Sequence, residues 1–303
     1  MERRHMCGIV GVFAKDPTLD PEIGRLLSGM LATMCERGPD SAGFAVYGKG
    51  VRGRLKLTLR GPQAFDFSSL GKRLACSAGV AVDVREHDTH AVIAFPAVGE
   101  AAVRTTIAQD APELDVVGAG TRMELFKEVG RPDAVARRFG LERMSGTHAI
   151  GHTRMATESA VTTDGAHPYS TGPDQCLVHN GSLSNHNDMR RKLVREGLSF
   201  ATENDTEVAA GYLAWRMREG DRLGDALERA LTELDGFYTF LVGTESGFGV
   251  LRDPICCKPA IMAETDEYVA FGTEYRALVD LPGIKEARVF EPEPAKVYLW
   301  ERD

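Results

Sequence analysis

The sequence lacks the features of a membrane protein, a secreted precursor or a general nucleic-acid binder. No apolar run approaches the roughly eighteen residues of a membrane-spanning helix, and the leading MERRHM lacks the apolar stretch of a signal peptide. Positive charge is also in short supply, since 36 Lys and Arg face 44 Asp and Glu and give a net charge of −8. We therefore expect neither a nucleic acid nor a membrane as a partner.

Cysteine is sparse and scattered. The six cysteines contain no C-x-x-C pair, and they are Cys7, Cys35, Cys76, Cys176, Cys256 and Cys257. This spacing predicts neither a disulfide framework nor a zinc site, and it favours a reducing, cytoplasmic compartment. Several histidines cluster between positions 148 and 186, but without an H-E-x-x-H arrangement they are best explained as core or loop residues. No metal and no other cofactor is expected.

What the sequence does contain is the composition of a globular protein, with 43% hydrophobic and 26% charged residues in a chain of 303. CGIVGVF and SAGFAVYG predict strands, and DPEIGRLLSGMLATMCERG predicts a helix. Three more helices are predicted from SNHNDMRRKLVREG, DTEVAAGYLAWRMREG and DRLGDALERALTELDG. The tail is rich in strand-like segments that favour antiparallel pairing, and the whole pattern suggests sheets covered by helices.

The stretch from about 51 to 145 differs from its surroundings. It combines strand-like segments (LKLTLR, HAVIAF, LDVVGAG) with helix-like ones (MELFKEVG, DAVARRFGL), and no Pro- or Ser-rich linker flanks it. We interpret it as a mixed α/β insertion within one domain that covers residues 7–303.

Individual candidate residues are ambiguous, because a lone cysteine in an apolar strand is usually part of the core. Taken together and in order, however, seven short segments carry a resemblance. They are CGIVGV from Cys7, RGPDSAG from Arg37, GHTRMAT from Gly151, AHP from Ala166, HNGSLSN from His179, DTE from Asp205 and RDP from Arg252. The chain resembles the class II glutamine amidotransferases of the N-terminal-nucleophile (Ntn) hydrolase superfamily, over most of its length apart from the insertion.

The resemblance makes Cys7 the nucleophile. A cysteine at a free N-terminus carries its own base, since an α-amino group has a pKa of about 7.7–8.0 and a thiol one of about 8.5. Attack on the side-chain amide of glutamine would give a glutamyl thioester and ammonia. This mechanism requires that residues 1–6 be a leader or propeptide that is removed.

The resemblance also assigns roles to other residues. Asn180 and Gly181 would form the oxyanion hole, through a side-chain amide and a backbone N–H.

The remaining assignments concern glutamine recognition. Arg154 would bind the α-carboxylate of glutamine with the Thr157 hydroxyl beside it, and Asp205 would bind the α-ammonium. Arg37 would steady the N-terminal cysteine, and His167 would shape the pocket. Two positions depart from the pattern of many relatives, which have tryptophan where this chain has Met155 and histidine where it has Glu158.

For the fold, the resemblance implies the α+β, four-layer αββα sandwich with two antiparallel sheets. For function, it implies hydrolysis of L-glutamine to glutamate and ammonia. Because the motifs and the strand-rich tail occupy the chain, we expect the ammonia acceptor on a separate synthase subunit, in an oligomeric complex resembling glutamate synthase or N-methylglutamate synthase. The alternatives are a free-standing Ntn amidohydrolase or glutaminase, and a non-catalytic glutamine-sensing module. A sugar-phosphate or purine-pathway transferase is less favoured, since no acceptor domain is evident.

Overall fold

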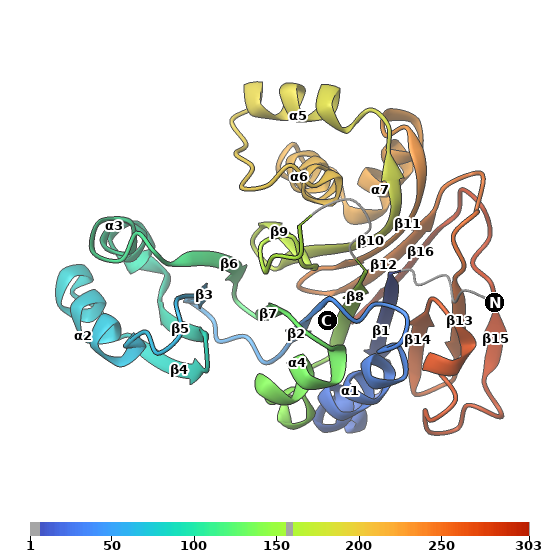
Figure 1. Cartoon of the computed structure of the whole chain (residues 1–303), viewed down its shortest axis with the longest axis horizontal. Coiled ribbons are helices and arrows are strands. Elements are labelled where there is room, and N and C mark those ends of the chain that lie inside the picture. The colour runs from blue at the N-terminus through green and yellow to red at the C-terminus, as the bar shows by residue number, and fades with distance from the viewer. Residues whose placement is uncertain (1–6, 156–159, 303) are drawn as a thin grey trace.

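The protein is described by a computed structural model that covers residues 7–155 and 160–302. Its centre consists of two sheets packed face to face, with helices outside each, so four layers follow one another from top to bottom in Figure 1. All strand pairings within these sheets are antiparallel. The expected αββα sandwich is thus confirmed.

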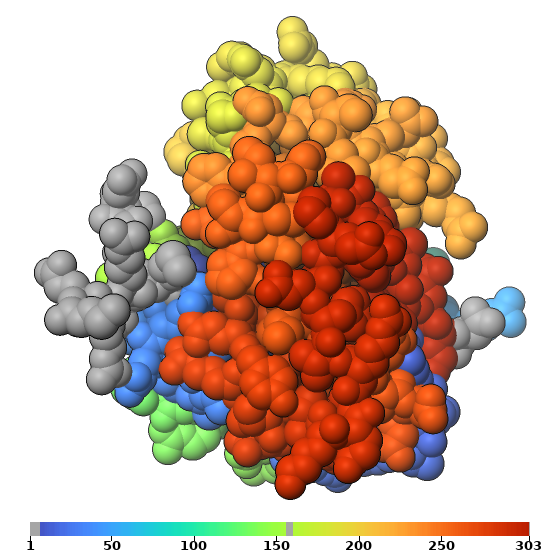
Figure 2. Space-filling model, turned by 90° about the vertical axis from the view of Figure 1, so that its right-hand side faces the viewer, coloured from blue at the N-terminus to red at the C-terminus, as the bar shows by residue number. Residues whose placement is uncertain are grey.

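The first sheet has seven strands. Their order is β15 (Arg288–Phe290), β13 (Ile261–Glu264), β14 (Tyr268–Gly272), β1 (Gly8–Ala14), β8 (His148–Arg154), β2 (Ser41–Tyr47) and β7 (Met123–Val129). The second sheet has five strands, in the order β16 (Val297–Glu301), β12 (Gly247–Arg252), β11 (Gly236–Gly243), β10 (Gln175–Leu183) and β9 (Tyr169–Gly172). The chain from β11 onward returns to both sheets, and its orange and red segments cover the face seen in Figure 2.

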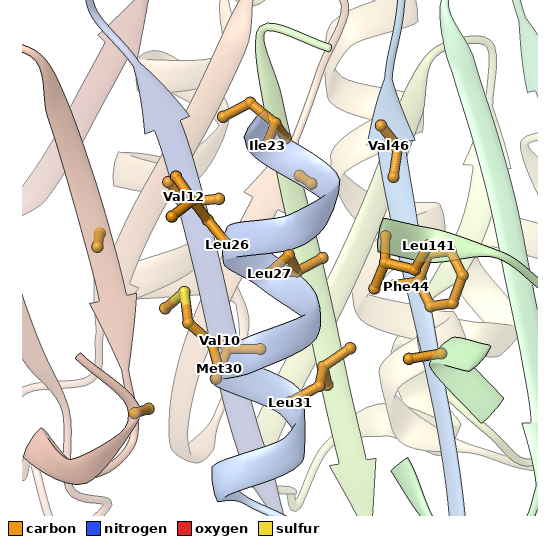
Figure 3. Packing of buried hydrophobic residues seen from close by; sticks show 14 of the residues in the cluster. Val10, Val12, Ile23, Leu26, Leu27, Met30, Leu31, Phe44, Val46 and Leu141 are labelled. Carbon is orange, nitrogen blue, oxygen red and sulfur yellow. The ribbon is translucent and has the colours of Figure 1, made fainter. Parts of the chain in front are cut away.

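The first sheet is covered by α1 (Ile23–Thr33) and α4 (Pro132–Arg138). Leu27, Met30 and Leu31 recur at helical spacing and are almost completely buried against β1 and β2 (Figure 3). The segment predicted as a helix begins at Asp20, but α1 itself begins at Ile23, after a short 3-10 turn, Pro17–Glu22, whose N-cap is Asp16. Asp20 instead pairs with Arg302 near the end of the chain.

The second sheet is covered by α5 (His186–Arg195), α6 (Asp205–Arg218) and α7 (Leu223–Glu233), as the sequence predicts. Between the two sheets lies a separate apolar layer that includes Ile9, Ile150, Val178 and Leu241. This layer fixes β1 of the first sheet against β10 of the second, and the functional site lies at one end of these two strands.

The insertion forms a small unit of its own beside the sandwich, at the left of Figure 1. Its sheet has the order β4 (Asp83–His87), β5 (His90–Pro96), β3 (Arg54–Arg60) and β6 (Asp115–Gly120), and α2 (Phe67–Ala78) and α3 (Glu100–Asp110) cover it. This unit is shorter than the expected range of 51–145. The segments after β6 rejoin the sandwich, because β7 pairs with β2 and α4 packs on the first sheet.

One segment that the sequence predicts to be a helix forms a strand. MELFKEVG consists mostly of good helix formers, yet Met123–Val129 forms β7 at the edge of the first sheet. Both of its faces are occupied: Leu125 enters the layer between the sheets and Phe126 the layer under α4. Glu124 pairs with Lys56 of the insertion. Tertiary contacts on both sides therefore override the local helix propensity.

None of the helices in the described ranges is both long and apolar enough to cross a lipid bilayer.

Candidate functional site

Cys7 lies directly before β1, and its backbone carbonyl is held by two side chains. Arg37 Nε donates to the Cys7 oxygen at 2.7 Å, and Asn180 Nδ2 donates to the same oxygen at 3.3 Å. Arg37 comes from the turn after α1 and Asn180 from β10 of the other sheet. Three segments that are distant in sequence thus meet at the backbone of one cysteine.

Two further residues complete this frame, and both come from the end of β14. Thr273 Oγ1 accepts hydrogen bonds from Ile9 N at 2.8 Å and from Asn180 Nδ2 at 3.2 Å. Glu274 forms an ion pair with Arg37. The antiparallel pairing of β1 with β14 brings these residues next to Cys7.

The Cys7 thiol lies in a partly buried and electrically positive place. Burial has the largest effect and leaves the pKa of the thiol above its ordinary value, while a contact with the Met155 backbone and the charges of Arg154, Arg37 and Lys258 act in the opposite direction. The sulfur lies 3.7 Å from the Met155 carbonyl oxygen. Positive charges near a cysteine favour its thiolate over its thiol. Three such charges around one cysteine are typical of a nucleophile rather than of a core residue.

A row of buried histidines supports Asn180 from behind. His152 Nε2 lies 3.3 Å from Asn180 Oδ1, and the His152 ring stacks on that of His167 with centroids 4.1 Å apart. Burial lowers the pKa of His152 to about 3 and that of His167 well below the ordinary value. Both rings are therefore neutral at pH 7, so neither supplies a positive charge to the site.

His167 and His179 share one hydroxyl. Thr206 Oγ1 lies 2.8 Å from His167 Nε2 and 3.0 Å from His179 Nδ1. Thr206 is the second residue of α6, so this contact ties the start of that helix to β10 and to the loop before β9. The His167 ring is thus held in place by the start of α6 and by the His152 ring.

Gly181 occupies a position that only glycine fills without strain. Its φ is +151°, and a Cβ there would lie 2.0 Å from the Phe237 carbonyl oxygen. The peptide that links Asn180 to Gly181 is thereby fixed on β10, next to the amide that contacts Cys7.

Asp205 and Arg154 come from opposite sides of the site. Asp205 is the first residue of α6, and its Oδ2 accepts from Leu183 N at 2.9 Å while the other oxygen lies 3.7 Å from His179 Nδ1. Arg154 ends β8, is buried, and donates to the Ala160 carbonyl oxygen at 3.4 Å. Thr157 and Glu158 lie outside the described residues.

Within the described ranges, no group of three or more His, Cys, Asp or Glu side chains is arranged to hold a metal ion. His148 illustrates what the remaining histidines do. It is fully buried, stacks on Tyr47, and contacts the Thr244 carbonyl oxygen at 2.9 Å.

Comparison with known proteins adds the decisive observation. The model of the glutamine amidotransferase domain family matches residues 152–280. The glutamine amidotransferase-like protein GlxB of Rhizobium meliloti is 60% identical over 297 residues, covering 98% of each chain. This chain belongs to the class II glutamine amidotransferases.

More distant relatives share only part of their length with this amidotransferase. The glutamine–fructose-6-phosphate aminotransferase of Haemophilus influenzae is 32% identical over 133 residues, which is 44% of this chain and 22% of that protein. The glutamine phosphoribosylpyrophosphate amidotransferase of B. subtilis superposes with a TM-score of 0.62 at 19% identity. The superposition covers 97% of this chain and 47% of the B. subtilis chain, and this likeness supports the fold.

The structure of this amidotransferase brings together most of the site residues that its sequence suggests, and it adds some that the sequence did not. Cys7, Arg37, Asn180 and Gly181 converge, with Arg154 close enough for its charge to act on the Cys7 thiol. The sequence did not point to Thr273, the last residue of the strand-like EYVAFGT, to Glu274 directly after it, or to Thr206 within the DTE segment. The available indication for Thr273 and Glu274 was their position at the end of a strand that pairs with β1, the strand that follows Cys7.

Proposed function

We propose that this amidotransferase hydrolyses L-glutamine to L-glutamate and ammonia through a thioester on Cys7. The observation that supports this most is the double fixation of the Cys7 carbonyl by Arg37 and Asn180, beside a thiol surrounded by positive charge. A cysteine that served packing alone would not need its backbone oxygen held by two side chains from different layers.

In the proposed reaction, the Cys7 α-amino group takes the thiol proton, directly or through water, and the sulfur attacks the side-chain carbonyl carbon of glutamine. The resulting oxyanion is stabilised by Asn180 Nδ2 and the Gly181 N–H. Collapse breaks the C–N bond, and the proton goes to the leaving group, which departs as ammonia. Water then hydrolyses the thioester to glutamate and regenerates the thiol.

This base requires a free α-amino group on Cys7, so we propose that the Met6–Cys7 peptide bond is cleaved in the active form, as expected for a leader or propeptide at residues 1–6. The hydrogen bonds to the Cys7 oxygen would hold the residue in place after cleavage, since neither involves its nitrogen.

Glutamine would be recognised through its charged α-carboxylate and α-ammonium groups. The Arg154 guanidinium offers a two-pronged contact for the α-carboxylate, with Thr157 beside it. Asp205 offers a carboxylate for the α-ammonium, and one of its oxygens is already oriented by Leu183 N. His167 would form a wall of the pocket.

We further propose that the ammonia passes to a synthase subunit on another chain, in a glutamate-synthase-like or N-methylglutamate-synthase-like complex. The 60% identical GlxB supports this proposal, because the match accounts for 98% of its own length and leaves GlxB little room for an acceptor domain. A cytoplasmic location suits a nucleophilic thiol that must stay reduced.

The chemistry can be tested on the isolated protein. Intact-mass analysis with a diazo-ketone analogue of glutamine should show a chain that begins at Cys7 and gains one label there. Cys7→Ser should abolish labelling and glutamine hydrolysis while Cys176→Ser, at a buried position in β10, keeps both. Active enzyme that retains Met1–Met6 would refute the α-amino base.

The partner can be tested separately. Co-purification should recover a synthase chain whose presence raises ammonia transfer over release. Full turnover by the isolated chain without such stimulation would favour a free-standing glutaminase, and glutamine binding without any turnover would favour a sensing module.

A further inference from the structure

A cavity that Cys7 does not line lies where the insertion meets the sandwich. It has a volume of about 360 Å³, within the range of small-molecule sites. The insertion contributes Lys56, Arg85 and His87, the sandwich contributes Glu124 from β7, and the segment after α4 contributes Arg143. None of these residues takes part in the proposed glutaminase chemistry.

Charge is unbalanced in this cavity. Its lining contains a single carboxylate, that of Glu124, against four cationic residues, Lys49, Lys56, Arg85 and Arg143. The chain as a whole carries a net charge of −8, so a local excess of positive charge is not a reflection of composition. It marks this cavity as a place that favours anions.

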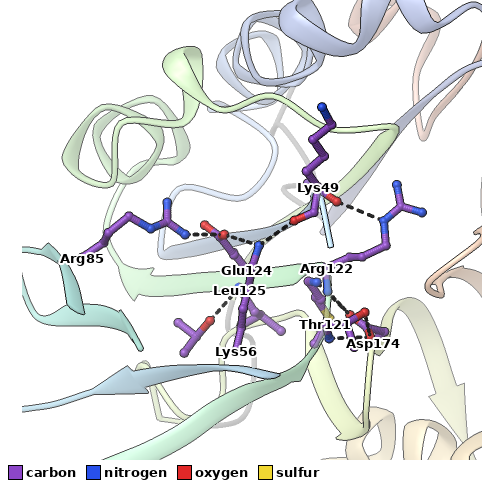
Figure 4. A network of polar contacts seen from close by, with 11 residues as sticks. Lys49, Lys56, Arg85, Thr121, Arg122, Glu124, Leu125 and Asp174 are labelled. Atoms are coloured by element: carbon purple, nitrogen blue, oxygen red, sulfur yellow. Dashed lines mark hydrogen bonds and ion pairs between the residues drawn. The ribbon is translucent and has the colours of Figure 1, made fainter. Parts of the chain in front are cut away.

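Glu124 organises the cations without neutralising them. Lys56 Nζ donates to Glu124 Oε1 at 2.8 Å, and Arg85 reaches the same oxygen from β4 (Figure 4). Burial raises the pKa of Glu124, but the charges and hydrogen bonds of Lys56 and Arg85 outweigh it and lower the pKa. Glu124 is therefore ionised and serves as a fixed anchor for both cations.

Donors remain available after these contacts. A guanidinium has five N–H donors, and the hydrogen bond recorded for Arg85 uses one of them. Across the described residues, no carboxylate pairs with Arg143. Arg85 and Arg143 are both exposed, while Lys56 is partly buried.

The pKa of His87 is affected by the same positive charges. Burial has the largest effect and lowers the pKa of His87. The charges of Arg85 and Arg143 lower it further, and the charge of Glu124 raises it. A neutral His87 adds a polar edge rather than a charge. Phe139 and Met144 supply apolar surface beside it.

We propose that this cavity binds a small organic dianion, either a phosphate monoester or a dicarboxylate, with its charged oxygens on Arg85, Arg143 and Lys56. The four cationic residues of the lining exceed the single charge of Glu124, and a dianion would offset most of that excess. Planar guanidinium groups suit both oxyanions, because each presents paired oxygens to a pair of N–H donors.

Such a ligand would join the insertion to the sandwich, because its cations come from both sides of the cavity. It would also contact β7, which contributes Glu124 to the lining.

Thermal unfolding of the full chain tests this proposal. At about 10 mM, either inorganic phosphate or succinate should raise Tm by about 2–4 °C relative to chloride of equal ionic strength. Acetate, a monoanion, should give a smaller shift. A response to phosphate alone would assign the phosphate class, and a response to succinate alone would assign the dicarboxylate class.

Variants locate the effect. Arg85→Gln and Arg143→Gln should each reduce the ligand-induced shift at least about threefold, because each loses charge-assisted hydrogen bonds. The matched control is Arg54→Gln, which removes a guanidinium from the same small sheet but outside the cavity, where it pairs with Asp83. Absence of any dianion-specific shift, or a shift that survives both cavity variants, would overturn the proposal. Neither result would bear on Cys7 chemistry.

Discussion

The role of Asn180 can be separated from its contribution to folding by Asn180→Ala. Its amide makes three contacts, to the Cys7 oxygen, to Thr273 Oγ1 and with His152 Nε2, at 3.2–3.3 Å. At roughly 1 kcal/mol each, their loss should cost about 3 kcal/mol of unfolding free energy. Removing one oxyanion donor should in addition lower kcat about 10²- to 10³-fold.

The assay is steady-state glutamine hydrolysis by the processed enzyme, with Tm measured in parallel. We expect kcat to fall and KM to change by no more than about threefold, because the lost interaction forms only in the transition state. A control for stability is Thr58→Val, which removes a buried hydroxyl that accepts from Leu125 N far from Cys7. It should lower Tm without lowering kcat. A decrease in kcat of less than about tenfold for Asn180→Ala would refute the oxyanion assignment.

Three further outcomes follow from the structure. Gly181→Ala should leave little active protein, because its Cβ would meet the Phe237 carbonyl oxygen at 2.0 Å; normal kcat and Tm would contradict this. Arg154→Lys should raise KM for glutamine about 10- to 100-fold with a smaller change in kcat, since a two-pronged contact becomes a single one; an unchanged KM would remove Arg154 from carboxylate binding. Burial lowers the pKa of Lys127 from 10.5 to about 8, so between those values the unfolded chain binds more protons and stability rises with pH. Denaturant unfolding should therefore show wild type gaining up to about 3 kcal/mol relative to Lys127→Met from pH 7.5 to 10.5, and parallel curves would refute the lowered pKa.

Much of the fold was predictable because its elements carry local patterns. The apolar stripe of α1 and the three helices over the second sheet follow helical spacing, and the tail strands follow short apolar runs bounded by turn residues. The two-sheet architecture itself came from the resemblance rather than from these patterns. What local patterns could not supply was the strand β7, whose residues favour a helix until both faces find partners.

The site was predictable where its residues lie in short motifs and not where they meet only through pairing of distant strands. Asn180 and Gly181 are adjacent in HNGSL, so one segment supplies both. Thr273, in contrast, contacts Ile9 across 264 residues of sequence, and only the register of β1 with β14 brings the two together. Nothing within EYVAFGT marks its last threonine as a neighbour of the β1 strand that follows Cys7.

Comparison of Cys7 with Cys176 shows why burial alone does not identify a packing cysteine. Burial raises the pKa of both thiols, that of Cys176 to about 12. Cys176 is fully enclosed beside the Tyr47 hydroxyl, and the nearby charge of Asp174 raises its pKa further. At Cys7 the nearby charges of Arg154, Arg37 and Lys258 act in the opposite direction, although burial keeps the pKa above its ordinary value. The sign of the surrounding charge, rather than the extent of burial, therefore separates the proposed nucleophile from the cysteine of the core.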